Sequence, residues 1–334
     1  MRCPKVKKAG GSVAPVRHWI PRVLRVSSAV AVLLMFLCTG FAAEWVPQEQ
    51  AQAKVTITPR EKRSTANSNI RLDVKMILVP ITVTDPTDKP VENLAPDSFR
   101  VFEDDVEQRI VSLSKEEGPV SVGFIFDTSS SMKNRMDKSV AAIEQFLKTN
   151  MPGDEYFLVR FADKPTLVTG FTRDPNDIVK ELSGLQPLGW TALHDAICLG
   201  VQQMKHAKNA RRALFVLSDG GDNNSRYSES EIRSLVVESD VRVYAVGIFE
   251  RPKLLEKLAT LTGGQALWAR TLKDLPEVVE TISREFRNQY MIGYSSNNPQ
   301  NDGKYRKVKV ELTESPFHRA LHLFWRRGYF APPE

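Results

Sequence analysis

Cysteine and histidine are scarce in this chain of 334 residues, which contains three cysteines and five histidines. So few cysteines exclude a small scaffold held together by several disulfide bonds. The few histidines leave little material for a Ser-His-Asp catalytic triad. Common enzyme signatures are also missing, namely G-x-x-x-x-G-K-[ST], H-E-x-x-H, G-x-S-x-G and C-x-x-C. We therefore do not expect an enzyme.

Acidic residues are missing from residues 1–43, although the whole chain carries a net charge of +6. The basic residues of this segment account for that excess, and the remainder of the chain is close to neutral. We therefore expect no nucleic-acid binding, which usually needs a basic domain. The basic residues in question are Arg2, Lys5, Lys7, Lys8, Arg17, Arg22 and Arg25.

The same segment has the layout of a targeting sequence. Its basic part is followed by the uncharged residues 26–43, which are most apolar at residues 29–37 and end with the small residues Gly40 and Ala42. This order predicts a signal peptide, while an uncharged run of this length is also borderline for a membrane anchor. We expect an exported protein that is periplasmic, secreted or part of the cell envelope. Cleavage would leave Cys198 as the one cysteine, so the processed chain could form no internal disulfide.

Two β-rich flanks surround a different middle part. Residues 44–69 are polar and aperiodic, which indicates a linker. The flanks at residues 70–118 and 291–334 are each too small to be stable alone. We therefore predict that they form one discontinuous β-sandwich. Their expected strands cover residues 70–84, 99–103, 108–113, 291–294, 305–312 and 321–325, because these runs alternate or are rich in β-branched residues.

The middle part, residues 119–290, alternates apolar strands with amphipathic helices. This order predicts an α/β domain with a doubly wound, mostly parallel sheet, inserted between the two β-rich flanks. The expected strands cover residues 120–126, 155–161, 212–217 and 241–248, and the expected helices cover residues 132–148, 192–205, 229–238, 253–261 and 275–288.

Oxygen-bearing side chains follow two of these strands and precede one helix. Asp127, Ser129 and Ser131 follow the first strand, Thr191 lies just before a helix, and Asp219 follows the strand at residues 212–217. Ligands in open α/β sheets bind at the carboxyl ends of strands. Carboxylates and hydroxyls are hard donors of the kind that Mg²⁺ requires. The sequence therefore predicts a divalent-metal site at this edge.

This set resembles the metal-ion-dependent adhesion site of von Willebrand factor A domains, with its order Asp-x-Ser-x-Ser, Thr, Asp. The resemblance covers about residues 119–288. It implies that Ser129, Ser131 and Thr191 reach Mg²⁺ or Mn²⁺ through their hydroxyls, and that Asp127 and Asp219 bind it directly or through water. It also implies an open coordination position for an Asp or Glu of a protein partner.

The flanks carry a second resemblance. Residues 78–84, 99–104, 302–310 and 327–330 resemble the VWFA-related proteins common in acidobacteria. This resemblance implies an exported bacterial protein.

Simpler interpretations exist for single residues. Asp-x-Ser-x-Ser often only caps a helix, and Thr191 could do the same. Asp222 is assigned to a turn. We interpret Asp195 as a structural hydrogen-bond partner of the loops rather than a ligand. In integrin β-type domains, which the same resemblance includes, paired acids after this position form an adjacent cation site; here Lys133 and Asn134 follow Met132 instead, so the resemblance implies no second metal.

Three functions compete. The complete set of candidate ligands favours a metal-dependent protein-binding or adhesion module. The alternatives are a structural cell-envelope protein that assembles through the β-sandwich, and a Mg²⁺-dependent hydrolase. The hydrolase would need a general base near Asp219, and the sequence offers none.

Overall fold

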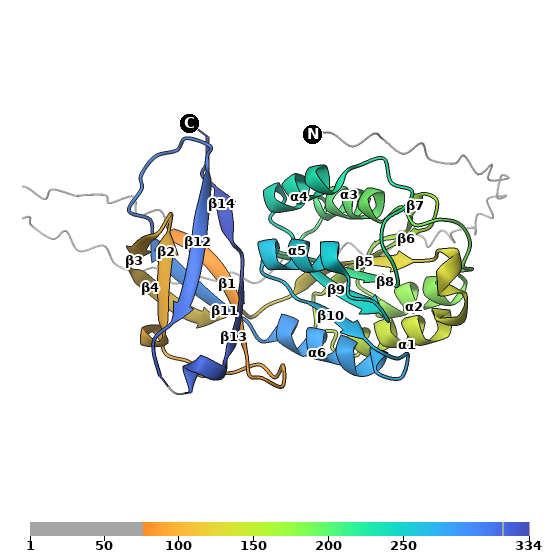
Figure 1. Ribbon diagram of the computed structural model, residues 1–334, viewed down its shortest axis with the longest axis horizontal. Coiled ribbons are helices and arrows are strands. Elements are labelled where there is room, and N and C mark those ends of the chain that lie inside the picture. Colours follow the sequence, from red (N-terminus) through yellow and green to blue (C-terminus); the bar gives the residue numbers. More distant parts are fainter. Residues whose placement is uncertain (1–75, 316, 334) are drawn as a thin grey trace, which may run out of the picture. The chain divides into compact units, whose positions relative to one another are not determined.

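Six strands form a mostly parallel central sheet in the computed structural model, which describes residues 76–315 and 317–333 (Figure 1). Their order across the sheet is β10-β9-β8-β5-β6-β7, and only β7 runs antiparallel to its neighbour. The strands are β5 (Val120–Asp127), β6 (Glu155–Phe161), β7 (Pro165–Thr172), β8 (Arg211–Ser218), β9 (Arg242–Ile248) and β10 (Ala266–Ala269). Every residue of β5 is buried, as expected for a parallel strand covered on both faces.

Helices cover both faces of this sheet (Figure 1). One face packs against α1 (Met136–Leu147), α2 (Pro175–Ser183) and α6 (Leu275–Arg287). The other packs against α3 (Leu193–Met204), α4 (Glu229–Glu238) and α5 (Lys253–Thr262). The predicted doubly wound α/β fold is confirmed.

The flanking segments form two antiparallel sheets of four strands each. One sheet has the order β13-β1-β11-β4 and the other has the order β14-β12-β2-β3, so each combines strands from before and after the α/β part. Figure 1 shows the early strands in orange and brown beside the late strands in blue. The strands are β1 (Met76–Thr84), β2 (Phe99–Glu103), β3 (Val106–Gln108), β4 (Ile110–Lys115), β11 (Tyr290–Ser295), β12 (Tyr305–Leu312), β13 (His322–Trp325) and β14 (Gly328–Phe330).

A shared apolar core joins the two antiparallel sheets. Ile81 of β1, Ile292 of β11, Val101 of β2 and Val310 of β12 all belong to one buried cluster. The sandwich therefore depends on both flanks, as the sequence pattern suggested. The boundaries at residues 118/119 and 290/291 stay a prediction.

Some elements differ from the sequence expectations. The single strand expected at residues 108–113 is wrong, because β3 ends at Gln108 and β4 begins at Ile110 in the other sheet. Alternation alone cannot reveal that a chain changes sheets. The expected helix at residues 132–148 begins later than predicted, because residues 132–134 belong to the 3₁₀ turn η2 (Ser130–Asn134) and α1 begins at Met136. Strands β7 and β10 and helix α2 were not expected. Two more 3₁₀ turns, η1 (Pro96–Ser98) and η3 (His318–Ala320), lie in the flanks.

The predicted signal peptide or anchor (residues 1–43) and the linker (residues 44–69) lie outside the described residues. None of the helices in the described part of the chain is long and apolar enough to cross a membrane. Cys198 is buried, as expected for a residue on an apolar helix face. The prediction that a processed chain has no internal disulfide stays a prediction.

A buried ion pair connects the amino end of β9 with the β-sandwich. Arg242 donates through Nη2 to both carboxylate oxygens of Glu116, at 2.9 and 2.8 Å. Arg242 also donates to Gln289, whose side chain donates to Thr82 Oγ1 of β1 at 3.0 Å and to Tyr244 Oη at 2.7 Å. The side chains of Arg242 and Glu116 are only 11% and 10% exposed. Glu116 also lies 3.7 Å from Arg211 Nε, so one carboxylate compensates two buried guanidinium groups.

We expect Glu116→Gln to lower the free energy of unfolding by about 3–5 kcal/mol, because it leaves a buried guanidinium without its counter-ion. Chemical denaturation of the purified protein measures this change. Glu107→Gln is the matched control, since Glu107 makes an equivalent two-point contact with Arg100 on the surface. Surface pairs contribute little, so the control should change stability only slightly. Equal effects of the two substitutions would contradict the assigned role of the buried pair.

A buried carboxyl on α6 predicts a second, pH-dependent effect. Glu285 is 1% exposed, and burial raises its pKa to about 9, with the negative charge of Asp88 acting in the same direction. Its unfolded-state pKa is near the ordinary value of 4.5. The folded state therefore favours the protonated carboxyl. Burial of Glu285 costs least in stability below pH 4.5, where the carboxyl is already protonated in the unfolded chain, and the free energy of unfolding falls as the pH rises from 4.5 towards 9.

We expect Glu285→Gln to raise the free energy of unfolding at pH 8 relative to the wild type, because the amide stays neutral without taking up a proton. The difference should grow with pH by up to about 1.4 kcal/mol per pH unit between pH 4.5 and 9. Denaturation curves at several pH values measure it. Glu280→Gln, on the exposed side of the same helix, should keep the wild-type pH profile. Parallel profiles for the wild type and Glu285→Gln would show that the carboxyl is ionised in the fold.

Candidate metal site

The candidate site lies where the strand order of the central sheet reverses. β5 and β8 are parallel neighbours, with Phe126 beside Leu217 in the register. The chain leaves β5 through α1 on one face and enters β8 from α3 on the other. Such a reversal opens a crevice at the carboxyl ends of the strands. Asp127 ends β5 and Asp219 follows β8, so both carboxylates lie at this edge.

Asp127 is fully buried and held on both oxygens. Its Oδ1 accepts a hydrogen bond from the backbone N–H of Ser129 at 2.8 Å, and its Oδ2 accepts from the Ser218 hydroxyl at 2.6 Å. Burial raises the pKa of Asp127, while these hydrogen bonds and the charge of Arg135 act in the opposite direction. The carboxylate is thus positioned by its neighbours before any ligand arrives.

A chain of side-chain contacts continues from Ser129 to Asp219. Ser129 Oγ lies 3.0 Å from Ser131 Oγ, and the Ser131 hydroxyl donates to Asp219 Oδ1 at 2.8 Å. Four of the five predicted ligands, Asp127, Ser129, Ser131 and Asp219, are therefore linked by hydrogen bonds. Ser131 is exposed while the other three are buried, so the cluster is reached from the side of Ser131.

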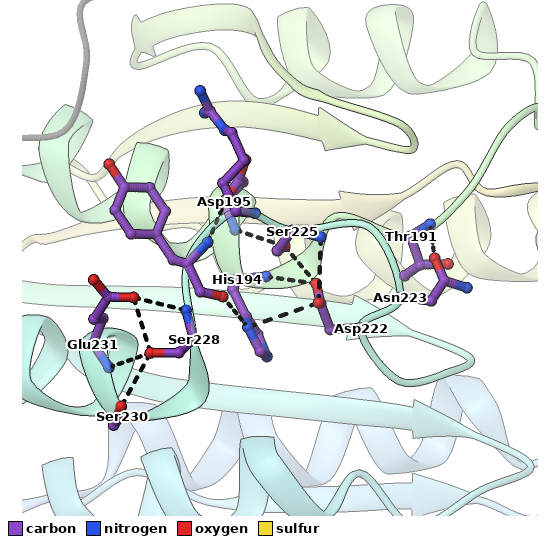
Figure 2. A network of polar contacts seen from close by, with 11 residues as sticks. Thr191, His194, Asp195, Asp222, Asn223, Ser225, Ser228, Ser230 and Glu231 are labelled. Atoms are coloured by element: carbon purple, nitrogen blue, oxygen red, sulfur yellow. Dashed lines mark hydrogen bonds and ion pairs between the residues drawn. The ribbon is translucent and has the colours of Figure 1, made fainter.

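Thr191 is tied to the loop after β8 by its backbone. Its N–H donates to Asn223 Oδ1 at 2.8 Å (Figure 2). Its carbonyl accepts from the N–H groups of Asn223 and Asn224 at 3.0 and 3.2 Å. The residue is buried and lies two residues before the first residue of α3, close to the helix start as predicted. These contacts fix Thr191 to the loop that carries Asp219. They do not link its hydroxyl to the other four candidate ligands.

Arg135, which lies between η2 and α1, was not among the residues expected at the site. Its Nη1 donates to Asp219 Oδ2 in an ion pair, and its guanidinium lies 4.6 Å from the centre of the Phe249 ring. Asp219 is 1% exposed at its side chain, so this positive charge compensates a buried negative one. The only signal in the sequence was a basic residue four positions after Ser131, and such residues are common on helix surfaces.

A second layer of carboxylates braces the loop between β8 and α4 (Figure 2). Asp195 of α3 accepts from the N–H of Arg226 at 3.0 Å and from its Nε at 2.8 Å, and it also accepts from the N–H of Tyr227. Asp222 accepts from the Ser225 hydroxyl and from the N–H of His194. Both carboxylates thus have the structural roles inferred from the sequence.

We expect Asp195→Asn to loosen this loop, because the amide group would turn an N–H donor towards Arg226. The free energy of unfolding should fall by about 1–3 kcal/mol, the usual cost of a buried polar group without its partner. Amide hydrogen exchange at Arg226 and Tyr227 should become faster. Asp177→Asn, which changes an exposed acceptor on α2, serves as the control. Unchanged exchange at both amides would contradict the bracing role.

The rim beside Thr191 is apolar and rigidly held. Leu188 and Trp190 are 75% and 65% exposed. The backbone N–H groups of Leu188, Gly189 and Trp190 donate to Thr128 O, Ser130 Oγ and Asp163 Oδ1, respectively. Gly189 has φ +95, and a Cβ there would lie 2.7 Å from the Asp163 carboxylate. Only glycine suits this position, so Trp190 projects from a fixed loop.

The donors suit a hard cation rather than zinc in a histidine or cysteine site. Across residues 76–315 and 317–333, no group of three or more His, Cys, Asp or Glu side chains is placed to hold a metal. The candidate ligands are two carboxylates and three hydroxyls, which match the preference of Mg²⁺ and Mn²⁺ for oxygen. The residues therefore fit a hard divalent cation, provided that Arg135 gives up its contact with Asp219.

Comparisons with known proteins agree with this fold. Residues 122–221 match the family of von Willebrand factor type A domains. Inter-alpha-trypsin inhibitor heavy chain H4 of Homo sapiens is 25% identical over 202 residues, which cover 55% of this chain and 22% of that protein. The chain thus spans only about a fifth of the length of this curated relative. The nearer resemblance to acidobacterial proteins stays a prediction.

Solved structures with the same kind of domain are also similar. The von Willebrand factor type A protein from Catenulispora acidiphila has a TM-score of 0.47 and 13% identity, over 76% of this chain and 72% of that one. Proximal thread matrix protein 1 from the mussel byssus, solved with zinc in its MIDAS motif, has a TM-score of 0.44 and 19% identity, over 55% and 49% of the two chains.

Proposed function

We propose that the von Willebrand factor type A domain of this chain binds Mg²⁺ or Mn²⁺ and uses the cation to hold an Asp or Glu of a protein partner. The proposed ligands are Asp127, Ser129, Ser131, Thr191 and Asp219. The observation that carries the proposal is the hydrogen-bond chain from Asp127 through Ser129 and Ser131 to Asp219. It gathers hard oxygen donors at the switch point of the sheet, where ligands bind in this class of fold.

The charges favour an acidic partner. Only two of the proposed ligands are negatively charged, and the hydroxyl ligands add no negative charge. The bound divalent cation is therefore not surrounded by excess negative charge and still attracts an incoming carboxylate. A pocket of about 290 Å³ beside Asp219 is also lined by Arg251 and Lys253. The lining also includes the acidic Asp222 and Glu250, so the pocket itself favours neither sign of partner and the argument rests on the charge of the bound cation.

Binding explains the site better than catalysis. A cation held mainly by hydroxyls activates water weakly compared with one held by histidines and carboxylates. The nearest histidine in sequence to these ligands, His194, has its Nδ1 2.7 Å from the carbonyl of Tyr227 and 3.7 Å from Asp222. It is thus already engaged in the second layer. We therefore propose a binding or adhesion module rather than a hydrolase.

Export to the periplasm, the cell envelope or the medium is part of the same proposal. It rests on the targeting pattern of residues 1–43, which suits a protein whose partners lie outside the cytoplasm. We also propose the domain boundaries inferred from the sequence pattern. The β-sandwich covers residues 70–118 and 291–334, and the α/β domain covers residues 119–290.

We expect calorimetric titration with Mn²⁺ to show one site per chain, and Asp127→Asn to weaken it by tenfold or more. The substitution removes one of the two charges that hold the cation while preserving the shape of the side chain. Asp137→Asn is the control, because Asp137 is exposed on the first turn of α1 and is not one of the proposed ligands. It should change affinity less than twofold.

Two outcomes would contradict the proposal. Equal losses in the two variants would mean that only overall charge matters. No binding of Mn²⁺ or Mg²⁺ to the wild type would remove the metal from the mechanism.

One observation favours the alternative of assembly through the β-sandwich. Met76 and Leu78 of β1 are 50% and 55% exposed, and their spacing of two residues puts both side chains on one face of the strand. Exposed apolar side chains on a sheet are typical of a contact surface when they cluster. Under this alternative, Asp127→Asn would leave partner binding intact and Leu78→Ser would weaken it.

A further inference from the structure

A basic side chain already holds one of the proposed metal ligands. Arg135 donates through Nη1 to Asp219 Oδ2, and Ser131 donates to the other oxygen of the same carboxylate at 2.8 Å. Within residues 76–315 and 317–333, Arg135 is the only basic side chain that donates to any of the five proposed ligands. Both oxygens of Asp219 are therefore occupied by protein donors.

The burial of this pair makes the contact strong. The Asp219 side chain is 1% exposed and that of Arg135 is 25% exposed. A carboxylate removed from water to this degree needs a nearby positive charge, and removing that charge is costly. Arg135 supplies it from within the chain. The pair is unlike the surface ion pairs of this protein, in which both partners are about half exposed.

The ring of Phe249 holds the guanidinium from the other side. The Arg135 Cζ atom lies 4.6 Å from the ring centre, within the range of a cation–π contact. Phe249 follows β9, has φ +68 and is 44% exposed. The arginine thus has a second stabilising partner that does not depend on Asp219.

We propose that Arg135 is an internal counter-cation that competes with the divalent metal for Asp219. This inference rests on the proposed function, because the metal is the competitor. A metal ion that binds Asp219 must take the place of the guanidinium at that carboxylate, since two cations cannot share its buried oxygens without strong repulsion. The contact with Phe249 stabilises the displaced guanidinium at the rim of the site.

Two consequences follow for the site. Metal affinity is lower than the five ligands alone would produce, because part of the binding free energy is used to break the ion pair. The metal-free fold is also stabilised, because Asp219 never lacks a positive partner. Arg135 therefore sets the metal concentration at which the site becomes competent for an acidic partner.

The test is calorimetric titration of Mn²⁺ into the full-length wild type, Arg135→Gln and Arg251→Gln. Arg251 is the matched control, because it is also a basic residue near Asp219 with its guanidinium over an aromatic ring, Trp268, but it pairs with Glu256. We expect Arg135→Gln to tighten Mn²⁺ binding by tenfold or more and Arg251→Gln to change it less than twofold. Arg135→Ala should behave like Arg135→Gln.

Thermal unfolding provides a second readout. Without metal, Arg135→Gln should have a lower Tm than the wild type, and with saturating Mn²⁺ its rise in Tm should be larger. Equal tightening of Mn²⁺ binding in Arg135→Gln and Arg251→Gln would overturn the inference, because it would mean that only the overall positive charge near the site, and not the Arg135–Asp219 pair, affects metal affinity. Weaker binding in Arg135→Gln would also overturn it and would make Arg135 a positioning residue.

The two proposals fail in different ways. If the wild type and Arg135→Gln bind Mn²⁺ equally, the counter-cation role is wrong and the metal site stands. If neither binds Mn²⁺ or Mg²⁺, the metal site is wrong and the competition falls with it. Binding that is detected only in Arg135→Gln would support the competition and contradict the proposed function, because the wild type would then hold no metal.

Discussion

The parallel pairing of β5 with β8 is the constraint on which the rest of the site depends. It brings Asp127 and Asp219 to one edge of the sheet, although 91 residues separate Asp127 from Ser218 at the end of β8. Two buried carboxylates at one edge repel each other unless donors surround them. Serine hydroxyls, a backbone N–H and Arg135 provide those donors. The hydrogen bonds and the ion pair that order the segment from Asp127 to Arg135 therefore compensate the negative charges of Asp127 and Asp219.

The opposite ends of the central sheet handle charge differently. At the amino ends, Arg211 and Arg242 lie on either side of Glu116, and the partners come from strands and their direct continuations. At the carboxyl ends, Asp219 relies on Arg135, a long side chain at the start of a helix with a second contact nearby. The first arrangement is closed and structural. The second is the one in which, on our proposal, a cation from solvent replaces a protein group.

Much of this fold was predictable because its strongest signals are local. The buried run ending at Phe126 identifies its strand without any tertiary information. The short strand β10 and the antiparallel β7 were missed because their side chains are half exposed and show no clear period. The meeting of Asp127 with Asp219 followed from strand order, and their roles as ligands stay predictions. The pairing of Arg135 with Asp219 depends on packing between distant segments, which sequence spacing does not encode.

The interleaving of early and late strands in the sandwich has a consequence for how the chain folds. Strand β1 lies between β11 and β13, so neither of its neighbours exists until the α/β part has been made. The α/β part has contacts that are closer in sequence and can form first. Until the last strands arrive, the edges of β1 and β4 present unpaired backbone groups that are prone to wrong association. During synthesis, the early strands of this protein are therefore exposed before their partners exist. Either a chaperone shields them in this interval or they remain unfolded until β11 and β13 are made.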